Sequence, residues 1–120
     1  MAFSILVVDD VAFMRNMVKA IVTDAGFEVV GEAVNGEEAL AKYEELLPDL
    51  VLMDIVMPVM DGLTALEELK KEHPGARVLV CSVMGQRDVV LKAVKLGAVD
   101  FVIKPFTPER LVDALRKAIR

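Results

Sequence analysis

The sequence predicts an α/β fold: a doubly wound parallel sheet of five strands with five helices packed on it. Short, mostly apolar segments alternate along the chain with longer amphipathic segments, as in repeated strand–helix units. Several of the short segments are apolar at every position, which is typical of strands buried on both faces. Glycine or proline follows most of the amphipathic segments, as at the ends of helices.

Ten elements are expected. The predicted strands cover residues 3–8, 27–33, 50–54, 77–82 and 100–103. The predicted helices cover residues 11–25, 37–47, 63–72, 87–96 and 108 to the end of the chain. Their connections are short and include no low-complexity segment, so one domain is expected over residues 1–120.

The first half of the chain contains two strand–helix units. Aliphatic residues dominate the first strand, and from Val11 the apolar residues recur with the period of a helix, which Gly26 ends. The second strand has more polar residues, which places it nearer an edge of the sheet. Asn35 and Gly36 then turn the chain into the second helix, and Pro48 closes that helix.

The second half adds three units, beginning with a strand that is apolar until it ends on Asp54. Leucines form the inward face of the third helix, and Pro74 follows its end. The fourth helix stops at Gly97. For the fifth helix, Thr107 is the expected N-cap, and Pro108 suits the first helical position.

Composition limits the function classes. Of 120 residues, 55% are hydrophobic and 28% are charged, which is typical of a globular protein. No apolar stretch approaches the roughly 18 residues of a membrane span, and the chain does not begin like a signal peptide, so no membrane association is expected. The single cysteine, Cys81, suits a cytoplasmic location. A net charge of −5 argues against nucleic-acid binding.

Polar side chains follow four of the five predicted strands. They are Asp9, Asp10, Asp54, Ser82 and Lys104. The carboxyl ends of parallel strands form the crevice in which α/β proteins bind ligands. If the first and third strands are neighbours, the three carboxylates converge and repel one another unless a cation neutralises them. Oxygen ligands of this kind suit Mg²⁺.

Lys104 and Ser82 extend the chemistry of this edge. Lys104 supplies a compact cation that can pair with Asp54 and with an anion, and Ser82 supplies a hydroxyl donor. A carboxylate held by a metal and a lysine is equipped for nucleophilic attack on a phosphoryl group. The structural alternative is that each strand-end residue only caps a loop or a helix, as single Asp and Ser residues often do.

These residues stand in motifs that resemble a known family. The motifs are Asp9-Asp10, residues 53–62 around Asp54, Ser82, and residues 104–106. Together they resemble the receiver domain of two-component response regulators over the whole chain. Residues 8–15 and 81–86 are especially similar to stand-alone chemotaxis regulators of the CheY type from thermophilic bacteria. The resemblance implies a flavodoxin-like sheet with the strand order 2-1-3-4-5, for which CheY is a standard example.

The resemblance assigns roles to the strand-end residues. Asp54 is the implied phosphoacceptor, which takes a phosphoryl group from the phosphohistidine of a histidine kinase. Asp10, Asp54 and the backbone carbonyl of Val56 are the implied Mg²⁺ ligands, and Asp9 reaches the ion through water. Apart from self-phosphorylation and self-dephosphorylation, the resemblance implies no enzyme activity.

The resemblance also implies a switch. Ser82 would rotate inward to bond a phosphoryl oxygen, Lys104 would pair with the phosphoryl group, and Phe101 would follow Ser82 toward the interior. The Lys104–Pro105 bond is expected to be cis. The output face would consist of the fourth helix, fifth strand and fifth helix. The implied partners of this monomer are the histidine kinase, a flagellar motor switch protein or another output protein, and a phosphatase.

Four positions depart from the common family pattern. Val83 stands where a small residue is usual, which narrows access to the phosphoryl group. Phe101 lacks the hydroxyl of the usual tyrosine. Val56 and Met84, the two positions that flank the acyl phosphate in the family, are both apolar and cannot orient an attacking water. The sequence therefore predicts slow self-dephosphorylation.

The first helix raises a further expectation. Met14 and Met17 share its inward face and are expected in the core, whereas Phe13 falls outside the apolar stripe and is expected to be exposed. Together with Val83 and Met84, Phe13 is expected to form an apolar docking rim at the mouth of the site.

Three alternatives remain open. A Mg²⁺-dependent phosphohydrolase with an aspartate nucleophile commonly has a second acid two residues after the nucleophile, where this chain has Val56. A nucleotide- or flavin-binding module needs a glycine- or hydroxyl-rich phosphate loop, where this chain has Asp9-Asp10. The third alternative is a receiver cut from a larger regulator, or an engineered, consensus-like receiver.

Overall fold

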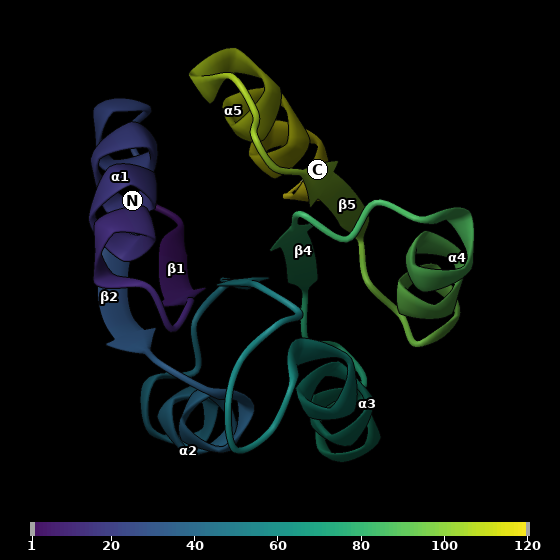
Figure 1. Ribbon diagram of the computed structural model, residues 1–120. Coiled ribbons are helices and arrows are strands. Elements are labelled where there is room, and N and C mark those ends of the chain that lie inside the picture. The colour runs from purple at the N-terminus through teal and green to yellow at the C-terminus, as the bar shows by residue number, and fades with distance from the viewer. Residues whose placement is uncertain (1, 120) are drawn as a thin grey trace.

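The computed structural model describes residues 2–119. Five parallel strands form one sheet in the order β2-β1-β3-β4-β5 (Figure 1). The strands are β1 Ser4–Val8, β2 Glu28–Ala33, β3 Leu50–Met53, β4 Val78–Ser82 and β5 Asp100–Ile103. The helices are α1 Ala12–Asp24, α2 Gly36–Leu46, α3 Gly62–Glu72, α4 Arg87–Lys95 and α5 Pro108–Ala118. The predicted fold and strand order are confirmed.

Two apolar layers cover the two faces of the sheet. Helices α1 and α5 pack on one face, and α2, α3 and α4 pack on the other (Figure 1). In β3, Leu50 and Leu52 face α1 and α5, whereas Val51 and Met53 face the opposite layer. All four side chains are buried. Burial on both faces explains why this strand is apolar until it reaches Asp54.

Burial in strand β2 agrees with the sequence pattern, whereas burial in helix α1 differs from it at one residue. Strand β2 lies at an edge and is mostly half-buried, as its polar residues predict. The prediction that Met17 belongs to the core is wrong, because its side chain is 36% exposed. Helix α1 is anchored on the sheet by Val18 and Val22, and Met17 instead lines an open pocket beside Phe106.

Side-chain caps fix several helix starts. Thr107 accepts a hydrogen bond from the backbone N–H of Arg110, with Pro108 in the first turn, as predicted. Asn35 caps α2 in the same way, through the N–H of Glu38. Within residues 2–119, no helix is long and apolar enough to cross a bilayer.

The loop after β3 contains a strained residue. Val59 has a φ of 69°, and the N–H of Met60 donates to the carbonyl of Pro58 at 2.8 Å across it. Such a tight turn with a positive φ is unfavourable for a β-branched residue. The Val59 side chain is 78% exposed, so little packing compensates for this strain.

Replacing Val59 with Asn is expected to raise the free energy of unfolding by about 1 kcal/mol, because Asn tolerates a positive φ. Urea denaturation would measure the change. Among the non-glycine residues that the structure describes, only Leu47 and Val59 have a positive φ. Val83→Asn, at a similarly exposed valine, is therefore the control and should be close to neutral. Equal effects of the two substitutions would contradict the assignment of strain to Val59.

Candidate functional site

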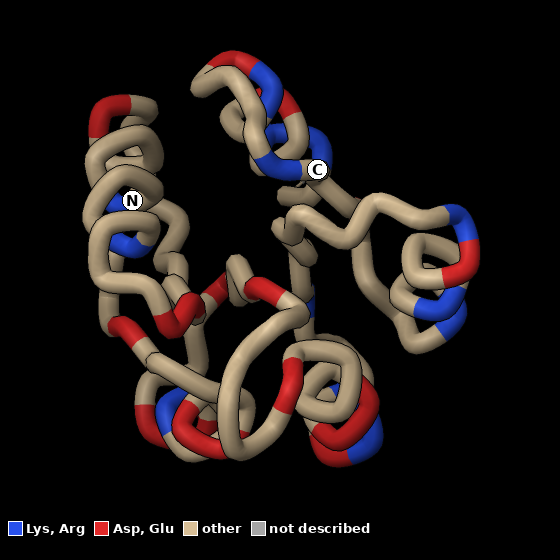
Figure 2. Tube along the Cα trace, viewed as in Figure 1, with Lys and Arg blue, Asp and Glu red and all other residues tan. Residues whose placement is uncertain are grey.

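Three carboxylates meet at the carboxyl ends of β1 and β3. The two strands are neighbours, with Val8 opposite Met53, so that Asp9 and Asp54 follow side by side. Each of Asp9, Asp10 and Asp54 offers a carboxylate oxygen, and these oxygens lie within 4.8 Å of one another. Figure 2 shows the acidic positions together at the centre of this edge. The structure thus brings together the acidic residues that the sequence predicts.

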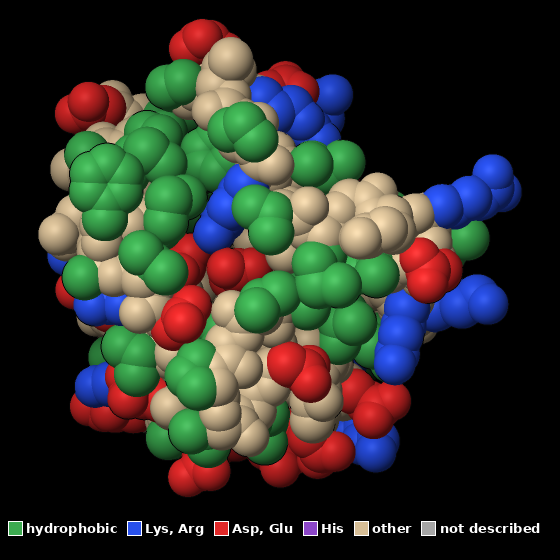
Figure 3. All heavy atoms as spheres, viewed as in Figure 1, with side chains coloured by type: hydrophobic (Ala, Val, Ile, Leu, Met, Phe, Trp, Pro, Cys, Tyr) green, Lys and Arg blue, Asp and Glu red, His purple; other side chains and the backbone are tan. Residues whose placement is uncertain are grey.

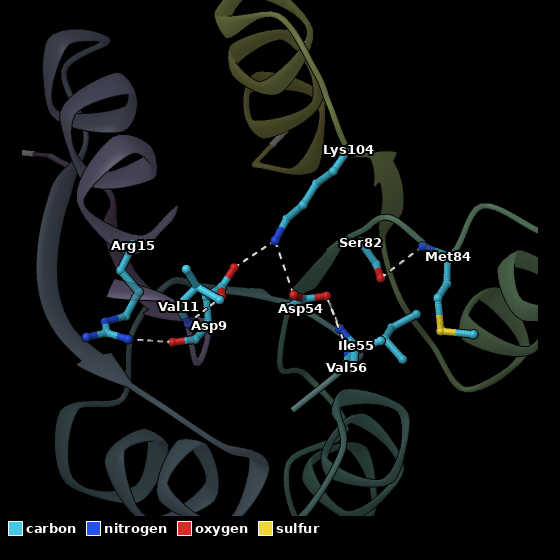
Figure 4. A network of polar contacts seen from close by, with 9 residues as sticks. All are labelled: Asp9, Val11, Arg15, Asp54, Ile55, Val56, Ser82, Met84 and Lys104. Atoms are coloured by element: carbon cyan, nitrogen blue, oxygen red, sulfur yellow. Dashed lines mark hydrogen bonds and ion pairs between the residues drawn. The ribbon is translucent and has the colours of Figure 1, made fainter. Parts of the chain in front are cut away.

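Lys104 lies above two of these carboxylates. Its Nζ donates to Asp9 Oδ2 at 2.7 Å and to Asp54 Oδ2 at 3.1 Å (Figure 4). Burial alone would lower the pKa of Lys104, but the hydrogen bond to Asp9 and the negative charges of Asp54 and Asp9 outweigh burial and raise it. Lys104 is therefore a cation at neutral pH. The bond to Pro105 is cis, as predicted.

The carboxylates also organise the loops that carry them. Asp9 is buried, and its Oδ1 accepts from the N–H of Val11 at 2.9 Å. Oδ1 of Asp54 accepts from the N–H of Ile55 at 2.7 Å. Asp10 is exposed. In the described chain, no side chain caps the first turn of α1, so the capping alternative does not explain the acidic pair. The sequence predicts that Lys104 pairs with Asp54. This bond is present at 3.1 Å, but the bond from Lys104 to Asp9 is shorter, at 2.7 Å.

Ser82 and Phe101 both lie inside the molecule. The Ser82 side chain is fully buried, and its Oγ accepts from the N–H of Met84 at 3.2 Å (Figure 4). Because α4 begins five residues later, Ser82 does not cap that helix. Phe101, whose ring is expected to move inward, is already buried in the core layer formed with α2, α3 and α4. Ser82 thus stands beside Asp54 at the next strand end, as predicted.

The rim of the site is apolar. Phe13, Val56 and Val83 are 75%, 53% and 67% exposed. Hydrophobic side chains lie on both sides of the acidic centre in Figure 3. A pocket of about 340 Å³ opens beside it and is lined by Met14, Met17, Val83, Lys104, Pro105 and Phe106. Met84 is partly buried against the core, so of the three rim residues expected from the sequence only Phe13 and Val83 are exposed.

Cys81 lies beneath the site but does not contribute a nucleophile. Its side chain is buried at the end of β4. Burial raises the pKa of the thiol to about 12, so the thiol is protonated at neutral pH. The expectation that Cys81 behaves as a buried apolar residue fits this environment.

The donor set fits a hard divalent cation. Three carboxylates face one ammonium group, which leaves the cluster with excess negative charge. All available donors are oxygens, and at least one of them, on Asp10, is exposed to solvent. Mg²⁺ prefers such ligands and retains water that a phosphate can displace.

One contact to the site has no signal in the sequence. Helical periodicity places Arg15 on the polar side of α1, yet its Nη1 donates to the backbone carbonyl of Asp9 at 2.8 Å. Its Nε donates to Oε1 of Glu32 at 3.0 Å. Glu32 lies on β2, so only the pairing of β2 with β1 brings this residue next to Arg15.

Comparison with known proteins assigns the chain to a family. Residues 5–116 match the response regulator receiver domain. The chain belongs to this family. The receiver domain is 57% identical to the chemotaxis protein CheY of Thermotoga maritima over 113 residues, which cover 94% of each chain. It is 53% identical to CheY of Bacillus subtilis over 99% of each chain.

Solved structures agree with this assignment. The crystal structure of the CheX-CheY-BeF3-Mg+2 complex from Borrelia burgdorferi contains a chain that superposes with a TM-score of 0.96 at 32% identity, covering 98% of this receiver domain and 90% of that chain. The response regulator domain of Thermotoga maritima CheB superposes with a TM-score of 0.88 at 37% identity. The chain is therefore a CheY-like receiver domain of two-component signalling, a family of signalling proteins and not of classical enzymes.

Proposed function

We propose that Asp54 accepts a phosphoryl group from the phosphohistidine of a partner kinase, in a Mg²⁺-dependent step of cytoplasmic chemotaxis signalling. One observation carries the proposal. Asp54 follows the central strand β3 directly and bonds Lys104, and it lies between the acidic pair that follows β1 and the hydroxyl of Ser82 on β4. Relatives that share more than half of its residues are chemotaxis proteins, which supports the pathway.

Each residue has a definite part in the proposed transfer. A carboxylate oxygen of Asp54 forms a bond to phosphorus as the phosphorus–nitrogen bond of phosphohistidine breaks, and the leaving imidazole takes its proton from solvent. Lys104 pairs with the transferred phosphoryl group. Asp9, Asp10, Asp54 and the backbone carbonyl of Val56 would hold Mg²⁺. When bound, the ion neutralises negative charge on the phosphoryl oxygens.

The proposed output lies on the face formed by α4, β5 and α5. Ser82 would exchange its contact with the N–H of Met84 for a phosphoryl oxygen, which couples the site to the start of α4. Three apolar residues of these elements are exposed, namely Leu91 and Val94 on α4 and Ile103 on β5. Lys and Arg residues lie on α4 and α5 (Figure 2). A flagellar motor switch protein is the proposed target of the monomer. A phosphatase would remove the phosphoryl group from Asp54 and so end the signal.

Incubation with acetyl phosphate tests the proposal. Intact-mass measurement should show one added phosphoryl group when Mg²⁺ is present and none when the metal is chelated. Inorganic phosphate, after subtraction of the amount that acetyl phosphate releases by spontaneous hydrolysis in a sample without protein, should rise only as the adduct decays. Steady phosphate release without an adduct would contradict the proposal and identify a phosphohydrolase instead.

Slow loss of the phosphoryl group is the second expected property. Val56 is exposed at the rim and Met84 is apolar, so neither side chain can orient a water molecule toward the acyl phosphate. Val56→Asn or Met84→Glu should shorten the half-life of the adduct by about tenfold or more, because a polar side chain can position water.

Mass spectra recorded during decay, after removal of the phosphodonor, would give these half-lives. Val99→Asn is the control, because Val99 is an exposed valine at the opposite end of the sheet. Its adduct should decay at the wild-type rate. If the wild type decays as fast as the Val56→Asn and Met84→Glu variants, the prediction is wrong.

A further inference from the structure

The loop between β1 and α1 carries both Asp9 and Asp10, and little holds its backbone. The N–H of Asp9 donates to the carbonyl of Ala33, and the N–H of Val11 is satisfied by Oδ1 of Asp9 itself. Among residues 2–119, no side chain caps α1 at this end. The carbonyl of Asp9 is instead bound by the guanidinium of Arg15 at 2.8 Å (Figure 4). This bond is charge-assisted and therefore stronger than a neutral one.

Arg15 is in turn held from the edge of the sheet. Its side chain is only 16% exposed, and its Nε donates to Oε1 of Glu32 at 3.0 Å. Oε2 of Glu32 binds Nζ of Lys19 at 2.9 Å, one helical turn further along α1. The hydrogen bond from Lys19, together with that from Arg15, lowers the pKa of Glu32 despite its partial burial, so Glu32 is ionised at neutral pH. Glu32 on β2 thus holds the side chains of both Arg15 and Lys19 in place.

Arg15 and Lys104 bind different atoms of the acidic residues. Lys104 binds the carboxylate oxygens of Asp9 and Asp54, which are candidate metal ligands. Arg15 donates to the backbone carbonyl of Asp9, an atom separate from those carboxylate oxygens. A cation in this place orients the acidic loop without competing for its donor atoms.

We propose that Arg15 is a positioning residue, which fixes the acidic loop for Mg²⁺ binding through the carbonyl of Asp9 and is itself fixed by Glu32. The inference rests on the proposed function, because it takes Mg²⁺ as the ligand of the acidic cluster. The inference predicts whether a substitution of Arg15 strengthens or weakens Mg²⁺ binding. Loss of a positive charge near a cation site should strengthen Mg²⁺ binding by Coulomb's law, whereas loss of a positioning contact should weaken it.

Calorimetric titration with Mg²⁺ alone, at fixed ionic strength, tests this inference. Arg15→Ala should weaken Mg²⁺ binding about tenfold, as expected for residues that orient metal ligands. Lys19→Ala is the matched control. Lys19 carries the same charge as Arg15, lies on the same helix and binds the same Glu32, but it does not bond Asp9. Its Kd should equal that of the wild type or be slightly lower. Arg15→Lys should be intermediate, since one ammonium cannot reproduce the fork of donors.

Urea denaturation of the same variants separates positioning from a purely structural role. Titrations are made far below the unfolding transition, so a loss of stability alone leaves Kd unchanged. Equal or tighter Mg²⁺ binding by Arg15→Ala, with a wild type that binds Mg²⁺, would overturn the inference and leave the proposed function intact. A wild type that binds no Mg²⁺ would overturn both.

Discussion

Replacing Lys104 with Met is expected to lower the free energy of unfolding by about 3 kcal/mol in the absence of divalent cations. The ammonium group bonds Asp9 and Asp54, and all three side chains are at most 12% exposed. Removing it leaves buried carboxylates without a partner, which is the costly way to break a buried ion pair. Methionine preserves most of the volume of the lysine stem, so packing contributes little to the loss.

Mg²⁺ should reverse much of this loss. A divalent cation that binds only the folded state stabilises it, and it should stabilise Lys104→Met more than the wild type because it replaces the missing charge. Urea denaturation at neutral pH, with and without Mg²⁺, measures both effects. Folding raises the pKa of Lys104. The contribution of Lys104 to the free energy of unfolding is therefore fully present below the unfolded pKa of about 10.4, and it is lost only as the pH rises through the pKa of the folded state.

An exposed lysine provides the control for this experiment. Lys71 is 65% exposed and lies 3.7 Å from Glu68 on the surface of α3. Lys71→Met should change the free energy of unfolding by no more than about 0.5 kcal/mol, and Mg²⁺ should not alter that change. A loss below about 1 kcal/mol for Lys104→Met, unaffected by Mg²⁺, would show that the carboxylates do not depend on this cation.

Asp54→Asn is expected to reduce phosphorylation by acetyl phosphate by at least about a hundredfold, because an amide oxygen is a poor nucleophile. The substitution is nearly isosteric, and the bond from Lys104 to Asp9 remains available. The variant should therefore fold. Intact-mass measurement on the folded protein, checked by circular dichroism, tests the expectation.

Substitutions of the other two carboxylates should behave differently. Asp9→Asn and Asp10→Asn should slow the formation of the adduct at low Mg²⁺ and recover part of the rate at high Mg²⁺, because these residues would hold the metal and not the phosphoryl group. Asp61→Asn is the control carboxylate, since Asp61 caps α3 and Asn is an equally good cap. Full phosphorylation of Asp54→Asn would place the acceptor elsewhere.

The elements of the fold could be predicted from sequence because each has a local cause. The continuous apolar run of β3 follows from burial on both faces, and Gly26 and Gly97 stand just past the ends of α1 and α4 with positive φ. The strand order 2-1-3-4-5 follows from the family resemblance and not from the residue pattern. The shift of register between Ile5 and Leu6, opposite β2, has no signal in the residue pattern.

The site was predictable only in part, because its contacts join distant parts of the chain. The types of residue at the strand ends indicate a metal and phosphoryl site even without the distances between them. The bond from Lys104 to Asp9 spans 95 residues, and the one from Arg15 to Glu32 depends on the pairing of β1 with β2. The exposure of Met17 also escaped prediction, since periodicity places it on the inward face while α1 overhangs an open pocket.

Reductive trapping tests the identity of the phosphoacceptor most directly. Borohydride converts an aspartyl phosphate to homoserine, which peptide mass spectrometry then locates in the chain. After incubation with acetyl phosphate and Mg²⁺, we expect homoserine at position 54 and unmodified aspartate at Asp9 and Asp10. Homoserine at position 9 or 10, or phosphate on a residue other than aspartate, would contradict the assignment of Asp54 as the phosphoacceptor.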